Sequence, residues 1–470
     1  MSRPKILRRN FVKKTGQFTL AASAASASSM PSSAKTVTIG NSTETRHVDV
    51  LVAGGGFAGV MAAIGARQYD HQVVLIEPHN VLGGQGVAGG VAGFCGDTAR
   101  VNRPFAELIS TLSNYNLIAP YNPNSDRRPY DLEGCAFFLQ ELVLAKGIYP
   151  FLHAQVIDAR TDLDGRVCDV LAVAPGKRIL YRPKMVIDAT GDCFLAHAAG
   201  LQTMHEGKNA QLPMSLYFTL WDTGGAVKPF LPQNCPSWEH DEELPMTTLH
   251  EFSSGKIEVK MKVIGFDSVD GESLSKAEMH ARRQMMGLIY YLQTHGYRGK
   301  LYDRYALASV SRQIGIRGSR RIIGEHVLRE EELKERTRFN DIVAVGTYHI
   351  DYHWPDRLER AGTGITTPLD PYAIPLRSLI AKGSQNLLVA GRCASADQMA
   401  MSSMRVMATC AQMGFAAGKA AVQCLDEGLP LSDVSVQKIQ TALTNDGQSL
   451  NLSQYGEYLK EQRESVQNAK

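Results

Sequence analysis

A glycine-rich turn after an apolar segment limits what this chain can fold into more than any other feature. Residues 47–53 are largely apolar and β-branched, which is typical of a buried parallel strand. Gly54, Gly56 and Gly59 follow in the pattern GxGxxG, and residues 60–69 continue as a helix-forming run without proline. The first glycine permits a tight turn, the second lets a pyrophosphate approach the backbone, and the third lets the helix pack on the strand.

A second predicted strand, residues 72–76, ends in Glu77, which lies 21 residues after Gly56. A carboxylate at this spacing accepts hydrogen bonds from both ribose hydroxyls of an adenosine, and it disfavours a cofactor with a 2′-phosphate such as NADP. Strand, fingerprint, helix, strand and acid together predict an α/β fold with a Rossmann-like central parallel sheet and a site for ADP-ribose. The alternative is a glycine turn without a ligand.

The segments that follow favour FAD over NAD. Residues 83–96 contain seven glycines, a density that suits close approach of the backbone to a large flat ligand. Residues 185–191 and residues 386–392 each have the pattern of a strand that runs into a glycine turn. A predicted helix over residues 402–423 could place its N-terminus against the negative charge of a reduced flavin. The alternative for that helix is core packing, which we expect for Met407, Met413 and Phe415.

In combination these segments resemble the glutathione-reductase-like FAD superfamily and, more narrowly, the FAD-dependent oxidoreductases. The resemblance also rests on residues 188–192 and 317–325, and it departs at Cys193, where we expect a small residue or glycine. It implies FAD bound in an extended form, with ADP under the N-terminal fingerprint and the isoalloxazine ring against the C-terminal segment. The cofactor contacts that it implies are Gly54, Gly56, Phe57, Ala58, Gly59, Glu77, Pro78, Gly83, Gly84, Gln85, Val156, Ala189, Thr190, Gly191, Asp192, Gly391, Arg392, Ser403, Met404, Arg405 and Val406.

The same reading predicts how the domains are arranged. We expect an FAD-binding domain in two parts, residues 48–204 and 341–430, that contains the central sheet, helices and a small β-meander. An inserted α+β substrate domain, residues 205–340, would cover the flavin ring. Residues 431–470 are predicted to be a polar, helical C-terminal tail.

Within the substrate domain the pattern predicts strands, a loop and a helix. Residues 215–220 and residues 256–265 alternate between apolar and polar side chains like strands, and the proline-rich residues 228–236 indicate a loop. The sequence Ser-Lys-Ala-Glu at residues 275–278 is a capping-box pattern, which predicts the start of a helix.

The N-terminus carries an export pattern over residues 1–34. Arg8 and Arg9 precede a weakly apolar stretch and a run of small residues, which closely resembles a twin-arginine signal. We expect cleavage after Ala34 or Ala27, export of the folded protein by the twin-arginine translocase, and a periplasmic or secreted location. The alternative is a disordered basic tail.

Charge and cysteine content argue against some partners. The formal net charge is +3, but without residues 1–34 the body has 44 basic and 47 acidic residues. A slightly acidic body without basic runs argues against nucleic acid as a partner. The eight cysteines have no CxxC pair or other ligand spacing, so we predict no metal site, and their redox state stays open.

A short polar and aromatic segment supplies the best candidates for catalysis. Residues 349–354 hold two histidines, an aspartate, a tyrosine and a tryptophan next to Pro355, which predicts a loop suited to a sugar or polyol. We expect His353, or else His349, to be the general base that takes a hydroxyl proton. The alternative for each is a structural histidine.

Two further groups of residues have candidate roles. Arg317, together with Arg320 and Arg321, could clamp a carboxylate or the FAD phosphates, although the last two could instead pair with Glu325. Cys95 could lie near the flavin, and the alternative is a buried inert thiol.

These features predict an exported FAD-dependent dehydrogenase or oxidase that moves hydride from a small polar metabolite to flavin N5. The substrate would be a sugar, a polyol or a hydroxy acid, and the electron acceptor oxygen, a quinone or a cytochrome. Two alternatives stay open. One is a flavoprotein with a net non-redox elimination or isomerisation, and the other is a flavin carrier or electron-transfer module without a substrate of its own.

Overall fold

The structure, a computed structural model, describes residues 43–67, 71–122, 125, 127–252, 255–358 and 364–455. The predicted export signal lies outside the described residues. None of the helices in this described part combines the length and the apolar composition that crossing a membrane requires.

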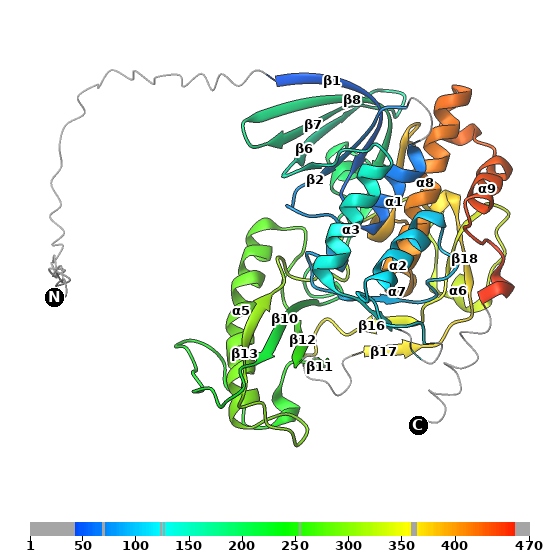
Figure 1. Cartoon of the computed structure of the whole chain (residues 1–470). Helices are drawn as coiled ribbons and strands as arrows, with labels where there is room; N and C mark the ends of the chain where they lie inside the picture. Colours follow the sequence, from blue (N-terminus) through cyan, green and yellow to red (C-terminus); the bar gives the residue numbers. More distant parts are fainter. Residues whose placement is uncertain are drawn as a thin grey trace, which may run out of the picture. The chain divides into compact units, whose positions relative to one another are not determined.

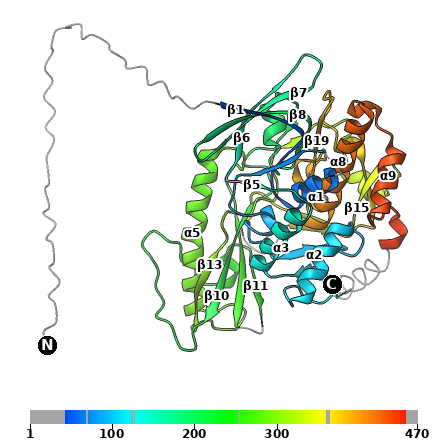
Figure 2. The same ribbon diagram turned by 45° about the horizontal axis from the view of Figure 1, so that its top comes forward.

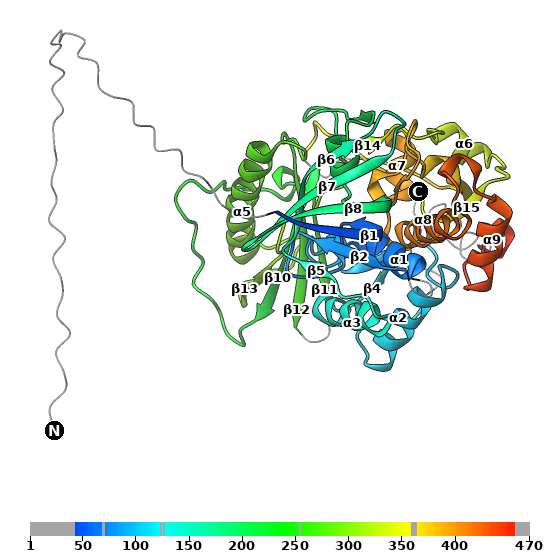
Figure 3. The ribbon, with the colours of Figure 1, turned by 90° about the horizontal axis from the view of Figure 1, so that it is seen from above.

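A sheet of seven strands forms the centre of the nucleotide-binding part (Figure 3). Its strands are β1 (Thr43–Ala53), β2 (Val73–Glu77), β5 (Phe151–Leu152), β6 (Gln155–Thr161), β7 (Val167–Ala174), β8 (Lys177–Asp188) and β19 (Leu387–Val389). The order is β5-β2-β1-β8-β7-β6, with β19 paired to the C-terminal end of β8. The strands β5, β2, β1, β8 and β19 run parallel, whereas β6, β7 and β8 form an antiparallel meander. The predicted Rossmann-like sheet is confirmed.

Two helices that are far apart in the sequence pack directly on each other against this sheet. They are α1 (Phe57–Ala66) and α8 (Met407–Glu427), which lie side by side in Figure 3. A Cβ on Gly414 would lie 1.9 Å from the Ala58 carbonyl oxygen, and one on Gly418 would lie 2.4 Å from that of Ala62. From the first contact to the second, both helices move four residues toward their C-termini, so they run in the same direction. Gly414 lies further from the start of α8 than Ala58 lies from the start of α1, so the N-terminus of α8 extends about two turns, ~10 Å, beyond that of α1.

A second sheet forms the substrate-domain side of the molecule. It has the order β11-β12-β10-β13, with strands β10 (Met214–Asp222), β11 (Thr247–Glu251), β12 (Lys256–Val263) and β13 (Tyr305–Val310). The long helix α5 (Gly271–Thr294) runs along these strands (Figures 1 and 2). Phe218, Val259 and Leu288 belong to one buried apolar cluster between sheet and helix. The two predicted strands of this region are confirmed, and residues 228–236 form neither helix nor strand, as predicted.

The predicted start of α5 was wrong. The N-cap is Asp270, whose Oδ1 accepts a hydrogen bond from the Ser273 backbone N–H at 2.7 Å. Ser275 instead lies inside the helix, and its hydroxyl donates to the Gly271 carbonyl. An aspartate is as good an N-cap as a serine, so the first of the two candidates in the chain begins the helix.

The predicted loop over residues 349–354 was also wrong. Ile350–His353 form strand β16, which pairs antiparallel with β17 (Gly364–Thr367). The pairing places the polar side chains of this segment at fixed positions on a hairpin. The C-terminal tail contains α9 (Val436–Asn445), and residues 456–470 lie outside the described part.

The other elements connect these layers, and the domain boundaries at residues 204 and 340 stay a prediction. The shorter helices are α2 (Arg103–Asn114), α3 (Leu132–Ala145), α4 (Phe194–Ala198), α6 (Glu330–Glu335) and α7 (Gln398–Met404). The shorter strands are β3 (Gly93–Cys95), β4 (Arg127–Pro129), β9 (Thr203–Met204), β14 (Arg321–Ile322), β15 (Ile342–Gly346) and β18 (Tyr372–Pro375).

Candidate FAD site and active site

The glycine fingerprint connects the end of β1 to the start of α1. Gly54 has a φ of +100° and lies so close to Ala189 that a Cβ would be 2.4 Å from its carbonyl oxygen. A Cβ on Gly59 would lie 1.7 Å from the Gly54 carbonyl oxygen. At Gly56 the nearest atom to a Cβ is the Gly84 Cα, 3.8 Å away. Two of the glycines are therefore needed for the turn itself, whereas Gly56 leaves the backbone open to a ligand.

Glu77, at the end of β2, holds this turn with its carboxylate. Its Oε2 accepts from the Gly55 N–H at 2.6 Å, and its Oε1 accepts from the His79 N–H at 2.9 Å. A hydrogen bond between the His79 ring and the same carboxylate raises the pKa of His79, against the effect of burial. Oε1 already accepts two bonds from His79, whereas Oε2 accepts one and can accept another, so the contact of Glu77 with a ribose stays a prediction.

The predicted adenosine end of the site includes residues on β6. The Ala154 N–H donates to the Glu77 carbonyl at 3.0 Å, so the chain after Glu77 and the start of β6 lie side by side. The Val156 side chain is buried in the core under the sheet. Pro78 and Val156 can therefore contact an adenine only along this short stretch of chain, and the Val156 contribution would come from its backbone.

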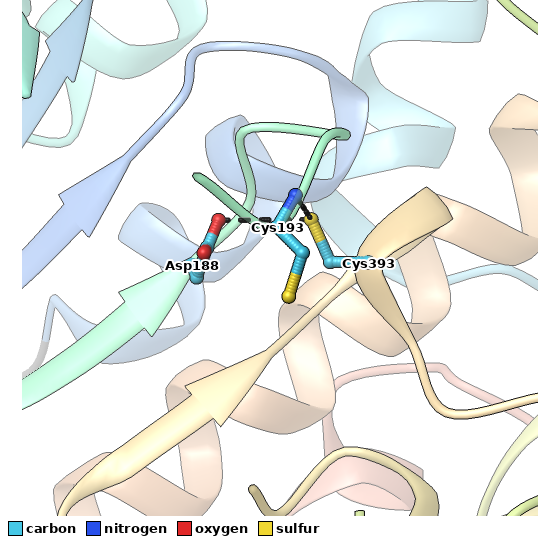
Figure 4. Close-up of side chains that lie close together, drawn as sticks. All are labelled: Asp188, Cys193 and Cys393. Atoms are coloured by element: carbon cyan, nitrogen blue, oxygen red, sulfur yellow. Dashed lines mark hydrogen bonds between the residues drawn. The ribbon is translucent and has the colours of Figure 1, made fainter. Parts of the chain in front are cut away.

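Two turns at the C-terminal ends of β8 and β19 are joined through a thiol (Figure 4). The Cys393 Sγ accepts hydrogen bonds from the backbone N–H groups of Gly191 and Cys193, each at 3.1 Å. The buried Asp188 carboxylate accepts from the Thr190 hydroxyl at 2.7 Å. Cys193, where the sequence departs from the expected pattern, adopts a left-handed φ of 52° and begins α4. This junction fixes Ala189, Thr190, Gly191 and Asp192 beside Gly391 and Arg392.

Asp188, Cys193 and Cys393 place three possible metal ligands within 4.8 Å of one another. The sequence could not indicate this group because its two cysteines are 200 residues apart. Burial raises the pKa of both Asp188 and Cys193, which favours their protonated forms. The Cys393 sulfur is already an acceptor for two backbone amides. We therefore interpret the group as a packed junction between the two turns.

The glycine-rich segment 83–90 meets the substrate-domain side at Gln85 and Gly90. The Gln85 Oε1 accepts from the Ile316 N–H at 3.1 Å, and the Arg392 Nη1 donates to the Ile316 carbonyl at 2.7 Å. A Cβ on Gly90 would lie 2.6 Å from the Tyr217 Cβ. The glycine-rich segment, the turn at Arg392 and strand β10 therefore converge on one place.

The predicted contacts at residues 403–406 have different environments. Ser403 and Met404 are fully buried, and the Ser403 hydroxyl donates to the Tyr348 carbonyl at 2.5 Å, so these two side chains serve packing. Arg405 points to β16, where its Nη2 donates to the Asp351 Oδ2 at 2.9 Å. Val406 is the N-cap of α8, and no side chain caps the first N–H groups of that helix.

A polar face lies opposite α5 on the second sheet. Along β12 the apolar residues pack toward α5, and the alternate residues Glu258 and Lys260 point to the other side. Tyr217 of β10 is the direct partner of Lys260 across the strands. The Arg127 Nη2, from β4, donates to the Glu258 Oε1 at 2.8 Å. This ion pair connects the polar face to the nucleotide-binding part.

His353 and Asp351, both on β16, form a buried pair near that face. The His353 Nε2 lies 3.1 Å from the Asp351 Oδ1. Burial alone would raise the pKa of Asp351, but the bond to His353 and the charges of Arg405 and Arg317 hold it well below its usual value. Burial and the charge of Arg317 lower the pKa of His353 to about 4. Near neutral pH the pair is therefore an aspartate and a neutral histidine.

The tautomer of His353 follows from this charge state. An ionised carboxylate only accepts, so Nε2 carries the proton and Nδ1 carries the free lone pair. The Nδ1 atom is buried and has no hydrogen-bond partner among the described residues. The His349 ring lies against the Tyr348 ring, with centroids 3.9 Å apart and the planes tilted by 33°.

The arginines of residues 312–321 are distributed over different partners. Arg317 is 8% exposed, and its Nη1 donates to the Pro213 carbonyl at 2.9 Å. Arg312 pairs with Glu133 on α3. Arg321 pairs with Glu206 rather than with Glu325, the partner proposed from the sequence. Of this group only Arg317 lies close enough to Asp351 and His353 to influence their pKa values.

The nucleotide side of the site has the features that FAD requires. The backbone is open at Gly56, and the N-terminus of α1 has no side-chain cap, so its N–H groups are available to a pyrophosphate. The N-terminus of α8 is uncapped in the same way. Two uncapped helix N-termini on parallel helices suit a long cofactor with one anionic group in its middle and an electron-poor ring at its end.

Comparison with known protein families agrees with this geometry. Residues 49–443 match the model of a family described as FAD dependent oxidoreductase. The chain belongs to this family. It is therefore an enzyme with FAD as its cofactor, and none of the curated proteins matches it.

Three solved structures illustrate what this FAD-dependent oxidoreductase is similar to. A geranylgeranyl bacteriochlorophyll reductase-like protein from Thermoplasma acidophilum aligns over 90% of this chain and 98% of its own, at 12% identity and a TM-score of 0.47. An anhydrotetracycline hydroxylase from Streptomyces rimosus aligns over 89% of this chain and 68% of its own, at 11% identity and a TM-score of 0.45. A p-nitrophenol 4-monooxygenase from Pseudomonas putida aligns over 91% of this chain and 98% of its own, at 12% identity and a TM-score of 0.43.

The sequence missed several residues of the polar cluster in this FAD-dependent oxidoreductase. Lys260 and Tyr217 lie on predicted strands, but the alternating pattern did not show which face would be covered. Asp351 lay inside the segment that supplied the two candidate histidines, and its spacing of two from His353 would have indicated one strand face. Cys95, on β3, influences the pKa of Tyr217 and of Arg127, which places it near this cluster, and its contact with the flavin stays a prediction.

Proposed function

We propose that this FAD-dependent oxidoreductase is a dehydrogenase or oxidase of a small polar metabolite, such as a sugar, a polyol or a hydroxy acid. When bound, FAD supplies the hydride acceptor at N5, and the electrons then pass to oxygen, a quinone or a cytochrome. One observation carries the proposal. The polar face with Tyr217 and Lys260 lies against the glycine-rich segment that is expected to hold the ring, together with Arg317 and the Asp351–His353 pair.

In this proposal His353 accepts the hydroxyl proton at Nδ1. Asp351 holds the Nε2 proton and so fixes the tautomer, while Arg405 holds Asp351. A buried acceptor without a partner costs roughly 1–3 kcal/mol, a cost that a folded protein tolerates most readily where a substrate completes the bond. We favour His353 because the bond to Asp351 fixes its tautomer, and its Nδ1 has no hydrogen-bond partner among the described residues.

The proposed location is the periplasm or the exterior of the cell. The support is the twin-arginine pattern with Arg8 and Arg9, together with the need of an FAD enzyme to load its cofactor before export. Fractionation of cells that produce the full chain would test this, with an Arg8→Lys, Arg9→Lys variant as the control. We expect the variant to stay in the cytoplasm with its FAD bound.

The first experiment is the visible spectrum of the purified protein, followed by anaerobic mixing with matched compounds. Glycolate against acetate, and glycerol against propane, each differ in the oxidisable carbinol. Bleaching of the flavin by one hydroxyl compound and not by its counterpart would support the proposal. A flavin that no compound bleaches would overturn it in favour of a non-redox enzyme or an electron carrier.

A further inference from the structure

The charges around the polar face do not balance. Arg127 pairs with Glu258, and Arg405 pairs with Asp351. Two further cations of this region, Arg317 and Lys260, have no such ion pair in the described part of the chain. Neither of them lies within 4.0 Å of a carboxylate oxygen of the residues that the structure describes.

Arg317 is buried, but most of its N–H donors form no hydrogen bond with the described residues. One of its five N–H donors reaches the Pro213 carbonyl, and no other hydrogen bond of its guanidinium is found among the described residues. Its nearest anion by electrostatic influence is Asp351, which already binds Arg405 and His353. A buried guanidinium without an anion is unfavourable, because charges leave water only at a high cost.

Lys260, the second cation, lies on β12 at the polar face. Burial, together with the charges of Arg317 and Arg127, lowers its pKa to about 8. Its position across from Tyr217 sets it on the polar face, and its side chain is partly exposed, so a ligand can reach it. Arg317 bonds to the Pro213 carbonyl just before β10, and Lys260 lies across from Tyr217 on β10. The charge of Arg317 also contributes to the lowered pKa of Lys260, so the two cations lie on the same side of the sheet and near each other.

We infer that Arg317 and Lys260 form a subsite for the carboxylate of an anionic substrate. This inference rests on the proposed function and narrows it, because it selects hydroxy acids over neutral sugars and polyols. A guanidinium matches a carboxylate with two parallel hydrogen bonds, and the lysine ammonium adds a third donor without fixed direction. The bound anion would also offset the charge of Arg317 that disfavours a protonated His353.

The test measures binding rather than turnover. Purified holoprotein is titrated with benzoate and oxalate, and with their neutral counterparts benzamide and oxamide, while the flavin absorbance is recorded. Charge-assisted hydrogen bonds are worth ~1.5–3 kcal/mol, so each carboxylate should bind about tenfold to a hundredfold more tightly than its amide.

Variants assign that preference to the two cations. Arg317→Met and Lys260→Met should each reduce the preference for the carboxylate by about tenfold. Arg283→Met, on an exposed position of α5, is the matched control and should leave it unchanged. If Arg317→Met loses its FAD, Lys260→Met alone carries the test, because Lys260 is less buried.

Equal binding of carboxylates and amides by the unaltered protein would overturn the inference, as would variants that keep the preference. Variants that lower the flavin reduction potential but bind carboxylates normally would also overturn it, since the cations would then serve the reduced ring. The absorption spectrum before titration separates these results from failure of the proposed function, which would show as missing flavin or as flavin that no hydroxyl compound bleaches.

Discussion

The fingerprint turn and the polar cluster are built in opposite ways. In the turn, the groups that face a ligand are backbone N–H groups, and residues 54–59 place them within six consecutive positions. In the cluster, the groups are side chains of Arg127, Lys260, Arg317 and His353, each from a different part of the chain. A site made of backbone can be recognised from local sequence, whereas a site made of side chains needs the fold to bring them together.

The two regions also differ in how exchangeable their residues are. A backbone site tolerates any neighbour that keeps the turn, so its sequence signal is the glycine spacing alone. The polar cluster depends on the identity of each charged side chain and on its partners. Mutations should therefore separate the two regions by what is lost.

The largest effect is expected at Gly56. Gly56→Glu should abolish FAD retention, because it sets a carboxylate against the pyrophosphate at an open position of the backbone. The fold should remain, since a Cβ at this position meets only the Gly84 Cα, at 3.8 Å. The measurement is flavin absorbance per protein together with circular dichroism. A purified variant that stays yellow would contradict this placement of the cofactor.

Gly59→Ala is the control from the same turn. Its Cβ would lie 1.7 Å from the Gly54 carbonyl oxygen, so we expect loss of both the flavin and the folded state. If both variants were equally unstable, the distinction between the two glycines would be wrong.

The next largest effect is expected at His353, in the polar cluster. His353→Ala should slow flavin reduction about 100-fold at saturating substrate while FAD stays bound, because the proton acceptor is lost. Stopped-flow absorbance under anaerobic conditions measures this rate. His349→Ala is the paired control, with a much smaller effect, and an unchanged rate in His353→Ala would return His353 to a structural role.

The pH dependence of carboxylate binding should sharpen the contrast further. The pKa of Lys260 is lowered to about 8 by burial and by Arg317 and Arg127, against the opposing effects of Asp351 and Cys95. The Lys260 side chain is therefore a charged ammonium below that pH and a neutral amine above it. Affinity for benzoate should be constant below pH ~8 and then weaken by about tenfold in total, the same loss as in Lys260→Met, as the ammonium loses its proton.

The Lys260→Met variant gives the control for that profile. Its benzoate affinity should be weaker and should not change between pH 6 and pH 10, since Arg317 keeps its charge throughout. A variant with the same pH dependence as the unaltered protein would show that another group titrates.

The smallest effect concerns the start of α5, behind the polar face. Asp270→Ala should lower the free energy of unfolding by about 1 kcal/mol, because it removes the N-cap bond to the Ser273 N–H. Ser275→Ala should have almost no effect, since that hydroxyl only bonds back to the Gly271 carbonyl. Urea titration followed by circular dichroism measures both, and the reverse ranking would restore the sequence-based capping box.

Much of the fold could be predicted from the sequence, with errors where local signals compete. The strands β1, β2, β10 and β12 agree with the predicted ranges to within a few residues. The start of α5 was misplaced because two good caps lie five residues apart. The segment of β16 was predicted to be a loop because its side chains are polar and aromatic. Its pairing partner β17 lies more than ten residues away, beyond the reach of a local pattern.

The sequence by itself determined the fingerprint turn between β1 and α1, because its tight turn and close helix packing require glycines at Gly54 and Gly59. Only the tertiary structure decided the polar cluster. The alternation along β12 gives the same pattern whether Glu258 and Lys260 face water or the nucleotide-binding part. Which face is covered depends on contacts such as that of Arg127 with Glu258, 131 residues apart. A local sequence pattern carries no information about such a distant charged side chain. The net charge of the polar cluster is therefore decided only in the folded chain.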